Sequence, residues 1–168
     1  MPYEHKIANL FRMTEEAWSR HANPWSVWTR VATFPLVLAA IWSRAWIGWW
    51  ALAPMGAVVV WLWLNPRLFR PPRRTDNWAS KATFGERVWL NRASVPIPAH
   101  HRRAATILSA ISGAGFAAAM VGAAMFDPMS ATSGGVVCML AKLWFCDRMV
   151  WLYEDMKDRD ETYRSWLR

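Results

Sequence analysis

The sequence predicts an all-helical protein with a single membrane domain, built as a bundle of four transmembrane helices. Two observations carry this prediction: four long apolar segments occur within the 168 residues, and most charged residues lie between them. A helix needs about 20 apolar residues to cross the ~30 Å hydrocarbon layer. Hydrophobic residues make up 54% of the chain, which excludes a disordered protein. Two cysteines exclude a disulfide scaffold.

The four expected spans cover residues 25–42, 45–64, 104–126 and 133–151. Asn23 and Pro24 are typical of an N-cap and a first helical position, so they predict where the first span begins. Asn65 and Pro66 predict the end of the second span, because proline does not continue a helix.

Three further segments are expected outside the bilayer. Residues 4–21 place apolar side chains at helical spacing and predict an amphipathic interfacial helix. In the long connector 65–103, Thr83 and Glu86 fit a capping box and predict a short amphipathic helix that faces the membrane. The charged tail 152–168 is expected to continue the fourth helix.

The distribution of cations predicts the orientation. The connector 65–103 holds nine Lys and Arg residues, whereas the turn 127–132 holds none. The positive-inside rule therefore places the connector and both termini in the cytoplasm, and the protein in a bacterial inner membrane. The net charge of +8 indicates this topology and contact with anionic lipid headgroups, not a nucleic-acid surface. The 14 tryptophans indicate aromatic belts at the membrane interfaces.

Four charged residues fall inside the expected spans: Arg30, Lys142, Asp147 and Arg148. Lys142 is the midpoint of the fourth span, where a charge is costly and needs a partner. Arg30 and Asp147 lie at matching depths, which predicts an ion pair between spans one and four. Two roles stay open for Lys142: a structural lysine, or a relay of protons or ions with Asp147.

His21, Glu86 and Asp147 are the candidate catalytic residues, because all three are expected near the cytoplasmic face. With His100 and His101 they could also assemble a metal site, although no spacing among them matches a known ligand motif. The sequence therefore predicts no metal and no cofactor. Each residue also has a structural alternative: His21 ends a helix, Glu86 caps one, and His100 and His101 contact lipid headgroups.

A stripe of small residues runs along the third span, comprising Ser112, Gly115, Ala119 and Gly122. Such a stripe lets another helix approach closely. The partner is either span four of the same chain, which the short turn favours, or span three of a second copy.

Three stretches resemble an uncharacterised family of small prokaryotic membrane proteins. They are Trp18–Arg30, with the pattern W-S-R-H-A-N-P-W-S-V-W-T-R, then Asn65–Phe69 and Asp147–Trp151. The resemblance implies a membrane location and supplies no activity, substrate or catalytic residue.

Three functions remain open at this stage. The first is a non-enzymatic subunit or binding partner of a membrane assembly, because no nucleophile motif, phosphate-binding loop or metal motif is found. The second is a membrane enzyme that acts on lipid headgroups and needs His21, Glu86 and Asp147 to converge. The third is an oligomeric proton or ion carrier, which needs a polar path on both sides of Lys142.

Overall fold

The computed structural model describes residues 14–168, and no strand occurs among them. The helical class is therefore confirmed for this part of the chain. The helices are α2 (Glu15–His21), α3 (Pro24–Trp42), α4 (Arg44–Ile47), the 3₁₀ turn η1 (Gly48–Ala51), α5 (Leu52–Leu68), α6 (Trp78–Leu90), α7 (Ala99–Met125), α8 (Pro128–Met156) and α9 (Glu161–Ser165).

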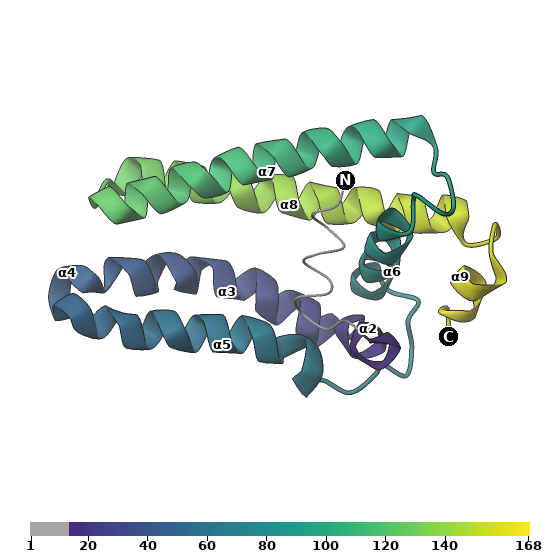
Figure 1. The fold of residues 1–168 in the computed structure, drawn as a ribbon, viewed down its shortest axis with the longest axis horizontal. Coiled ribbons are helices and arrows are strands. Elements are labelled where there is room, and N and C mark those ends of the chain that lie inside the picture. Colours follow the sequence, from purple (N-terminus) through teal and green to yellow (C-terminus); the bar gives the residue numbers. More distant parts are fainter. Residues whose placement is uncertain (1–13) are drawn as a thin grey trace.

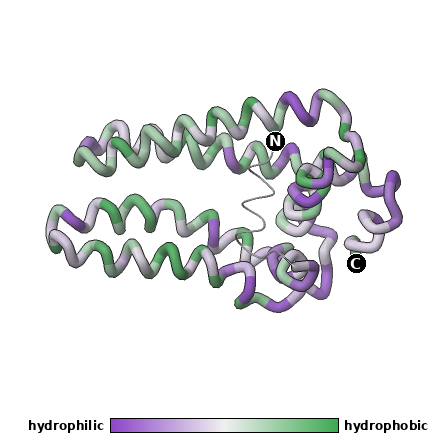
Figure 2. Tube along the Cα trace, viewed as in Figure 1, coloured by the Kyte–Doolittle hydropathy of each residue, from purple (hydrophilic) through white to green (hydrophobic). Residues whose placement is uncertain are grey.

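Two antiparallel helical hairpins form the body of the molecule, α3 with α5 and α7 with α8 (Figure 1). Three segments are long and apolar enough to cross a membrane: Pro24–Leu68, Ala99–Met125 and Pro128–Met156. The first of them contains both helices of the α3–α5 hairpin. Hydrophilic residues gather at one end of the molecule, around α2, α6 and α9 (Figure 2). We call this the polar end, and the opposite end, with α4, η1 and the Phe126–Asp127 turn, the turn end.

Helix α3 begins as the sequence predicts. The side chain of Asn23 accepts a hydrogen bond from the backbone N–H of Trp25 at 2.9 Å, and Pro24 occupies the first helical position. The helix ends at Trp42, and the chain turns back at Gly48. Gly48 has a φ of 54°, a conformation that glycine adopts without the steric cost of a side chain.

The prediction for the second span is wrong at both ends, because α5 runs from Leu52 to Leu68 instead of 45–64. Residues 45–51 are used for the turn. Pro66 lies inside the last turn of α5, where it removes only one backbone donor and few residues follow. Asn65 holds this end against α3: it accepts from Ser26 Oγ and donates to Thr29 Oγ1, each at 2.8 Å.

Helices α7 and α8 approach each other through the small-residue stripe. A Cβ added at Gly115 would lie 2.6 Å from the backbone nitrogen of Cys138, and Ala119 is completely buried. Ser112 Oγ donates to the carbonyl of Cys138 at 3.2 Å. The stripe therefore faces α8 of the same chain, and the two backbones are in direct contact.

Helix α6 starts five residues before the expected capping box, because Asn77 is its N-cap and accepts from the N–H of Ser80 at 3.0 Å. The capping box at Thr83 is thus wrong: Thr83 lies inside the helix and donates to the carbonyl of Ala79. The apolar side of α6 does not face a membrane surface. It packs on α8, so tightly that a Cβ at Gly85 would lie 1.9 Å from the carbonyl oxygen of Met149.

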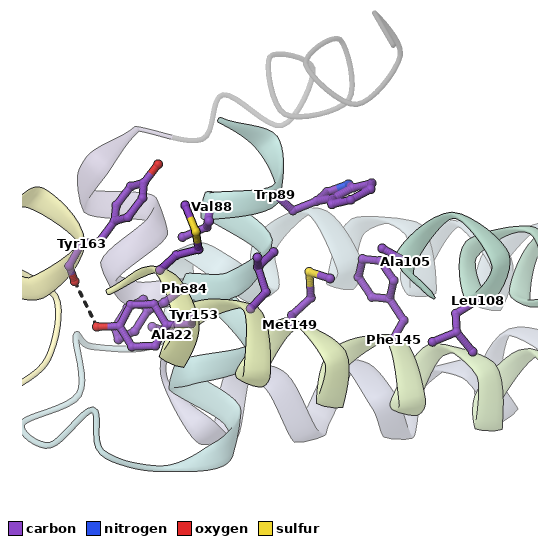
Figure 3. Close-up of a cluster of buried hydrophobic side chains, with 12 residues drawn as sticks. Ala22, Phe84, Val88, Trp89, Ala105, Leu108, Phe145, Met149, Tyr153 and Tyr163 are labelled. Atoms are coloured by element: carbon purple, nitrogen blue, oxygen red, sulfur yellow. Dashed lines mark hydrogen bonds between the residues drawn. The ribbon is translucent and has the colours of Figure 1, made fainter. Parts of the chain in front are cut away.

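The main core lies at the polar end, between α6, α7, α8 and α9 (Figure 3). Its fully buried members include Val88, Met149 and Tyr153. Tyr153 Oη donates to the carbonyl of Tyr163 on α9 at 3.0 Å (Figure 3). The tail therefore does not simply extend the fourth helix. It continues α8 only to Met156 and then folds back onto the core.

The last residues also bind the connector between α5 and α6. The N–H of Arg168 donates to Thr75 Oγ1 at 2.7 Å, and the N–H of Thr75 donates to the carbonyl of Arg168 at 3.0 Å. Of the interfacial helix expected over residues 4–21, residues 4–13 lie outside the described residues. The rest forms α2, which Arg20 links to the end of α5 through a 2.9 Å bond to the carbonyl of Arg67.

Candidate functional site

A groove of about 280 Å³ opens between the two hairpins near the polar end. Helices α3 and α8 form its walls, and α6 closes one side with Ala82, Thr83 and Glu86. Most of the side chains that line it are apolar. Its charged residues are Arg30, Glu86 and Lys142.

Lys142 and Glu86 form an ion pair across this groove. The ammonium of Lys142 on α8 donates to Glu86 Oε1 on α6 at 2.8 Å. It also lies 4.5 Å from the centre of the Phe145 ring, a distance at which a cation is attracted by the ring face. Half of the Lys142 side chain and a quarter of the Glu86 side chain remain open, which leaves the pair accessible from the groove.

Arg30 and His21 form the second contact of the cluster. A guanidinium nitrogen of Arg30 contacts both ring nitrogens of His21. Burial, and after it the charge of Arg30, lower the pKa of His21 from 6.5 to about 3, and the charge of Glu86 only partly opposes them. His21 is therefore neutral at pH 7 and leaves the positive charge of Arg30 uncompensated.

Glu86 stays ionised at the centre of the cluster. Burial acts to raise the pKa of Glu86, but the charge of Lys142, its hydrogen bond and the charge of Arg30 outweigh burial and hold the pKa below its usual range. Among the residues that line the groove, one carboxylate therefore stands against two cations. The site carries one net positive charge within apolar walls. We call His21, Arg30, Glu86 and Lys142 the groove cluster.

The expected ion pair between Arg30 and Asp147 is wrong. Asp147 instead accepts from Trp78 Nε1 and from Arg148 Nη2, each at 3.3 Å. Asp147 also points away from Lys142, which lies five residues earlier on α8. Five residues along an α-helix correspond to about 140° of rotation, so the two side chains leave α8 on different sides. The prediction failed because the matching depths of Arg30 and Asp147 do not determine which faces of α3 and α8 point toward each other.

The candidate catalytic residues are only partly brought together. His21 and Glu86 both belong to the groove cluster, where Arg30 lies close to both. Asp147 is turned toward Trp78 and Arg148. The arrangement expected of an enzyme with these three residues is therefore not formed.

The remaining histidines lie in a separate place. His100 and His101 begin α7 and meet Asp155 near the end of α8, with His101 Nε2 at 2.7 Å from Asp155 Oδ2. Neither His21, Glu86 nor Asp147 joins this group. Sequence reasoning missed Asp155, although a hairpin register counted back from the Phe126–Asp127 turn places it within about one helical turn of His101.

These features define a class: a small helical protein with apolar hairpins of membrane-spanning length and a charged groove between them. The chain belongs to the DUF6653 family, a family of unknown function whose model matches residues 2–165. The resemblance to an uncharacterised family is thereby confirmed. Searches of curated proteins and of solved structures found no match.

Proposed function

We propose that this protein is a non-enzymatic, four-span protein of a bacterial inner membrane that binds an anionic amphiphile in its groove. The headgroup would contact Arg30 and Lys142, and the acyl chains would follow the apolar residues of α3 and α8. The observation that carries the proposal is the charge of the groove: two cations share one carboxylate, Glu86, inside largely apolar walls. The excess positive charge of this site is only partly solvated, so it attracts an anion more strongly than the same charge in bulk water.

The orientation in this proposal follows the distribution of cations. The connector 65–103 carries nine of them and belongs to the polar end, whereas the residues 127–132 at the turn end carry none. A cytoplasmic polar end agrees with the positive-inside rule. Trp46, Trp49 and Trp50 are exposed at the turn end, as expected of side chains at the opposite membrane interface. The groove would then open at the level of the cytoplasmic leaflet.

The two other functions have weaker support. An enzyme that uses His21, Glu86 and Asp147 would need the three side chains at one reactive point, and Asp147 lies elsewhere. A carrier would need polar groups beyond Lys142 toward the turn end. The groove residues on that side include Phe34 and Met139, which offer no path for a proton or an ion.

Native mass spectrometry in a mild detergent tests the proposal. The protein would be equilibrated with equal amounts of phosphatidylglycerol and phosphatidylcholine, which have similar chains and differ in headgroup charge. We expect one retained phosphatidylglycerol. We expect Arg30→Met to reduce this adduct at least about tenfold and Arg30→Lys to retain most of it, because lysine keeps the charge. Arg103→Met is the matched control, since Arg103 is exposed outside the groove.

Equal retention of both lipids, or an equal loss in Arg30→Met and Arg103→Met, would overturn the proposed binding site. The same spectra report the oligomeric state. A retained protein partner or a second copy of the chain, without any bound lipid, would favour a subunit of a membrane assembly in place of an amphiphile-binding protein.

A further inference from the structure

A second cluster of side chains lies where α7 begins and α8 ends, at the polar end. One potential ligand atom from each of His100, His101 and Asp155 lies within 4.8 Å of the other two. The rings of the two histidines are 4.1 Å apart, and His101 Nε2 is 2.7 Å from Asp155 Oδ2. Two imidazoles and one carboxylate form a donor set that suits zinc and similar divalent transition metals.

The environment of His101 provides an independent observation. Its exposed fraction is 3%, yet its Nδ1 atom has no hydrogen-bond partner among the described residues. Buried polar atoms nearly always have partners, so a buried imidazole whose one described hydrogen bond is made by Nε2 to Asp155 is incompletely satisfied. The imidazole is held on one side only, by an aspartate that could instead ligate a metal.

We propose that His100, His101 and Asp155 bind one divalent transition metal ion. Bonds of about 2.0–2.2 Å to nitrogen and oxygen place neighbouring ligand atoms about 3–3.6 Å apart. The proposal requires His100 and Asp155 to rotate to this spacing, and both have room to do so, because His100 is exposed and half of the Asp155 side chain is exposed, while His101 is buried. The remaining coordination positions are left for water.

The bound metal would join the start of α7 to the end of α8. The two residues in contact, His101 and Asp155, already link these helix ends, and a metal would replace their hydrogen bond with two coordination bonds. Arg102 and Arg103 follow on exposed positions of α7 and oppose a cation. Water screens such exposed charges, so we expect moderate affinity.

Isothermal titration of Zn²⁺ into the full-length protein in detergent, prepared without a polyhistidine tag, tests this site. We expect one Zn²⁺ per chain and at least about tenfold weaker binding in His100→Gln and in Asp155→Asn. Both substitutions change exposed or half-exposed side chains, so both variants are expected to fold. Asp158→Asn is the matched control, because Asp158 is an exposed carboxylate just beyond α8 that pairs with Arg164.

Absorption of Co²⁺ in the visible range provides a second measurement, because it reports the ligands of the bound ion directly. We expect a ligand-field band in the original protein and in Asp158→Asn, and its loss in His100→Gln. Absence of stoichiometric Zn²⁺ binding would overturn the proposal. Binding that is equally strong in His100→Gln and Asp155→Asn would overturn it as well.

Discussion

At the scale of single residues, the net charge and the stability of the groove cluster depend on which of its charges have partners. Glu86 neutralises one of two cations, and neutral His21 cannot neutralise the other. Removing one member of a buried pair is costly because the other is left without compensation, whereas removing both costs much less. This asymmetry makes the pair of Lys142 and Glu86 testable by stability alone.

We expect Lys142→Met to lower the free energy of unfolding by about 2 kcal/mol. This is less than the ~3–5 kcal/mol of a fully buried pair, because both side chains are partly open to the groove. The double variant Lys142→Met, Glu86→Gln should recover much of the loss. Reversible unfolding in mixed micelles measures all three proteins. Simple addition of the two single effects would contradict the ion pair.

His21 makes stability depend on pH. Because its folded pKa is lowered from 6.5 to about 3, the unfolded chain binds the proton more tightly. The contribution of neutral His21 is complete above pH 6.5 and is lost as pH falls from 6.5 toward 3, by at most about 1.4 kcal/mol per pH unit. The expected result is a flatter dependence in His21→Gln.

Thermal unfolding followed by circular dichroism at a series of pH values measures this dependence. With a chelator present to keep the proposed metal site empty, His100→Gln is the control, because His100 is exposed and lies outside the groove cluster. If His21→Gln kept the same slope as the original protein, His21 would not be the titrating group.

At the scale of helices, glycine positions decide how closely the elements pack. Gly115 and Gly134 bring the backbones of α7 and α8 into contact, and Gly85 does the same for α6 and α8. The α6 contact also matters for the groove, because it places Glu86 beside Lys142. Within a lipid bilayer the hydrophobic effect does not drive helices together, so close packing of this kind drives their association instead.

We expect Gly115→Ala to destabilise the protein by about 2–3 kcal/mol, since the new Cβ would lie 2.6 Å from the backbone nitrogen of Cys138 and only separation of the helices can relieve the overlap. Gly113→Ala is the matched control two residues earlier, where an added Cβ meets nothing within 4 Å. It should leave stability unchanged or raise it by up to about 1 kcal/mol. Unfolding in mixed micelles compares them, and equal losses would contradict the hairpin contact.

At the scale of the whole molecule, the two hairpins meet at both ends. At the turn end, the rings of Trp42 on α3 and Phe126 are 6.1 Å apart, and α3 also contacts α7 directly. At the polar end, helix α6 packs against α8 and contacts α3, and the end of the chain binds Thr75 in the connector. Helix α8 has 29 residues, about 43 Å, which exceeds the ~30 Å hydrocarbon layer. Its last turns are therefore free to form the core with α6 and α9.

The proposed topology predicts which positions are accessible from outside the cell. In a background with Cys138 and Cys146 replaced by alanine, Ser130→Cys should react with a membrane-impermeant maleimide added to intact cells. Ser94→Cys should react only after the membrane is opened, because the connector 65–103 is expected in the cytoplasm. Labelling of both variants in intact cells, or of Ser94→Cys alone, would contradict this orientation.

Local sequence patterns were enough to predict the helical class, the long apolar segments and the start of α3. Asn23–Pro24 begins α3 as predicted, because caps and prolines act through neighbouring backbone atoms. Helix α8 begins at Pro128, five residues before the expected start at 133, with Asp127 as its N-cap. The small-residue stripe indicated a close helix contact for the same reason: the shape of one helix face is encoded within a few residues.

Tertiary structure alone decided which residues form the groove cluster. Glu86 and Lys142 are 56 positions apart, and α8 is largely apolar on all sides, so no local pattern marks the face that meets α6. The start of α6 at Asn77 sets the direction of Glu86, and the close contact of Gly85 with Met149 sets its distance from Lys142. The sequence determined the helical class and the apolar segments because their causes are local, whereas the bounds of α5, the fold of the tail and the partners of the buried charges depend on how the helices pack.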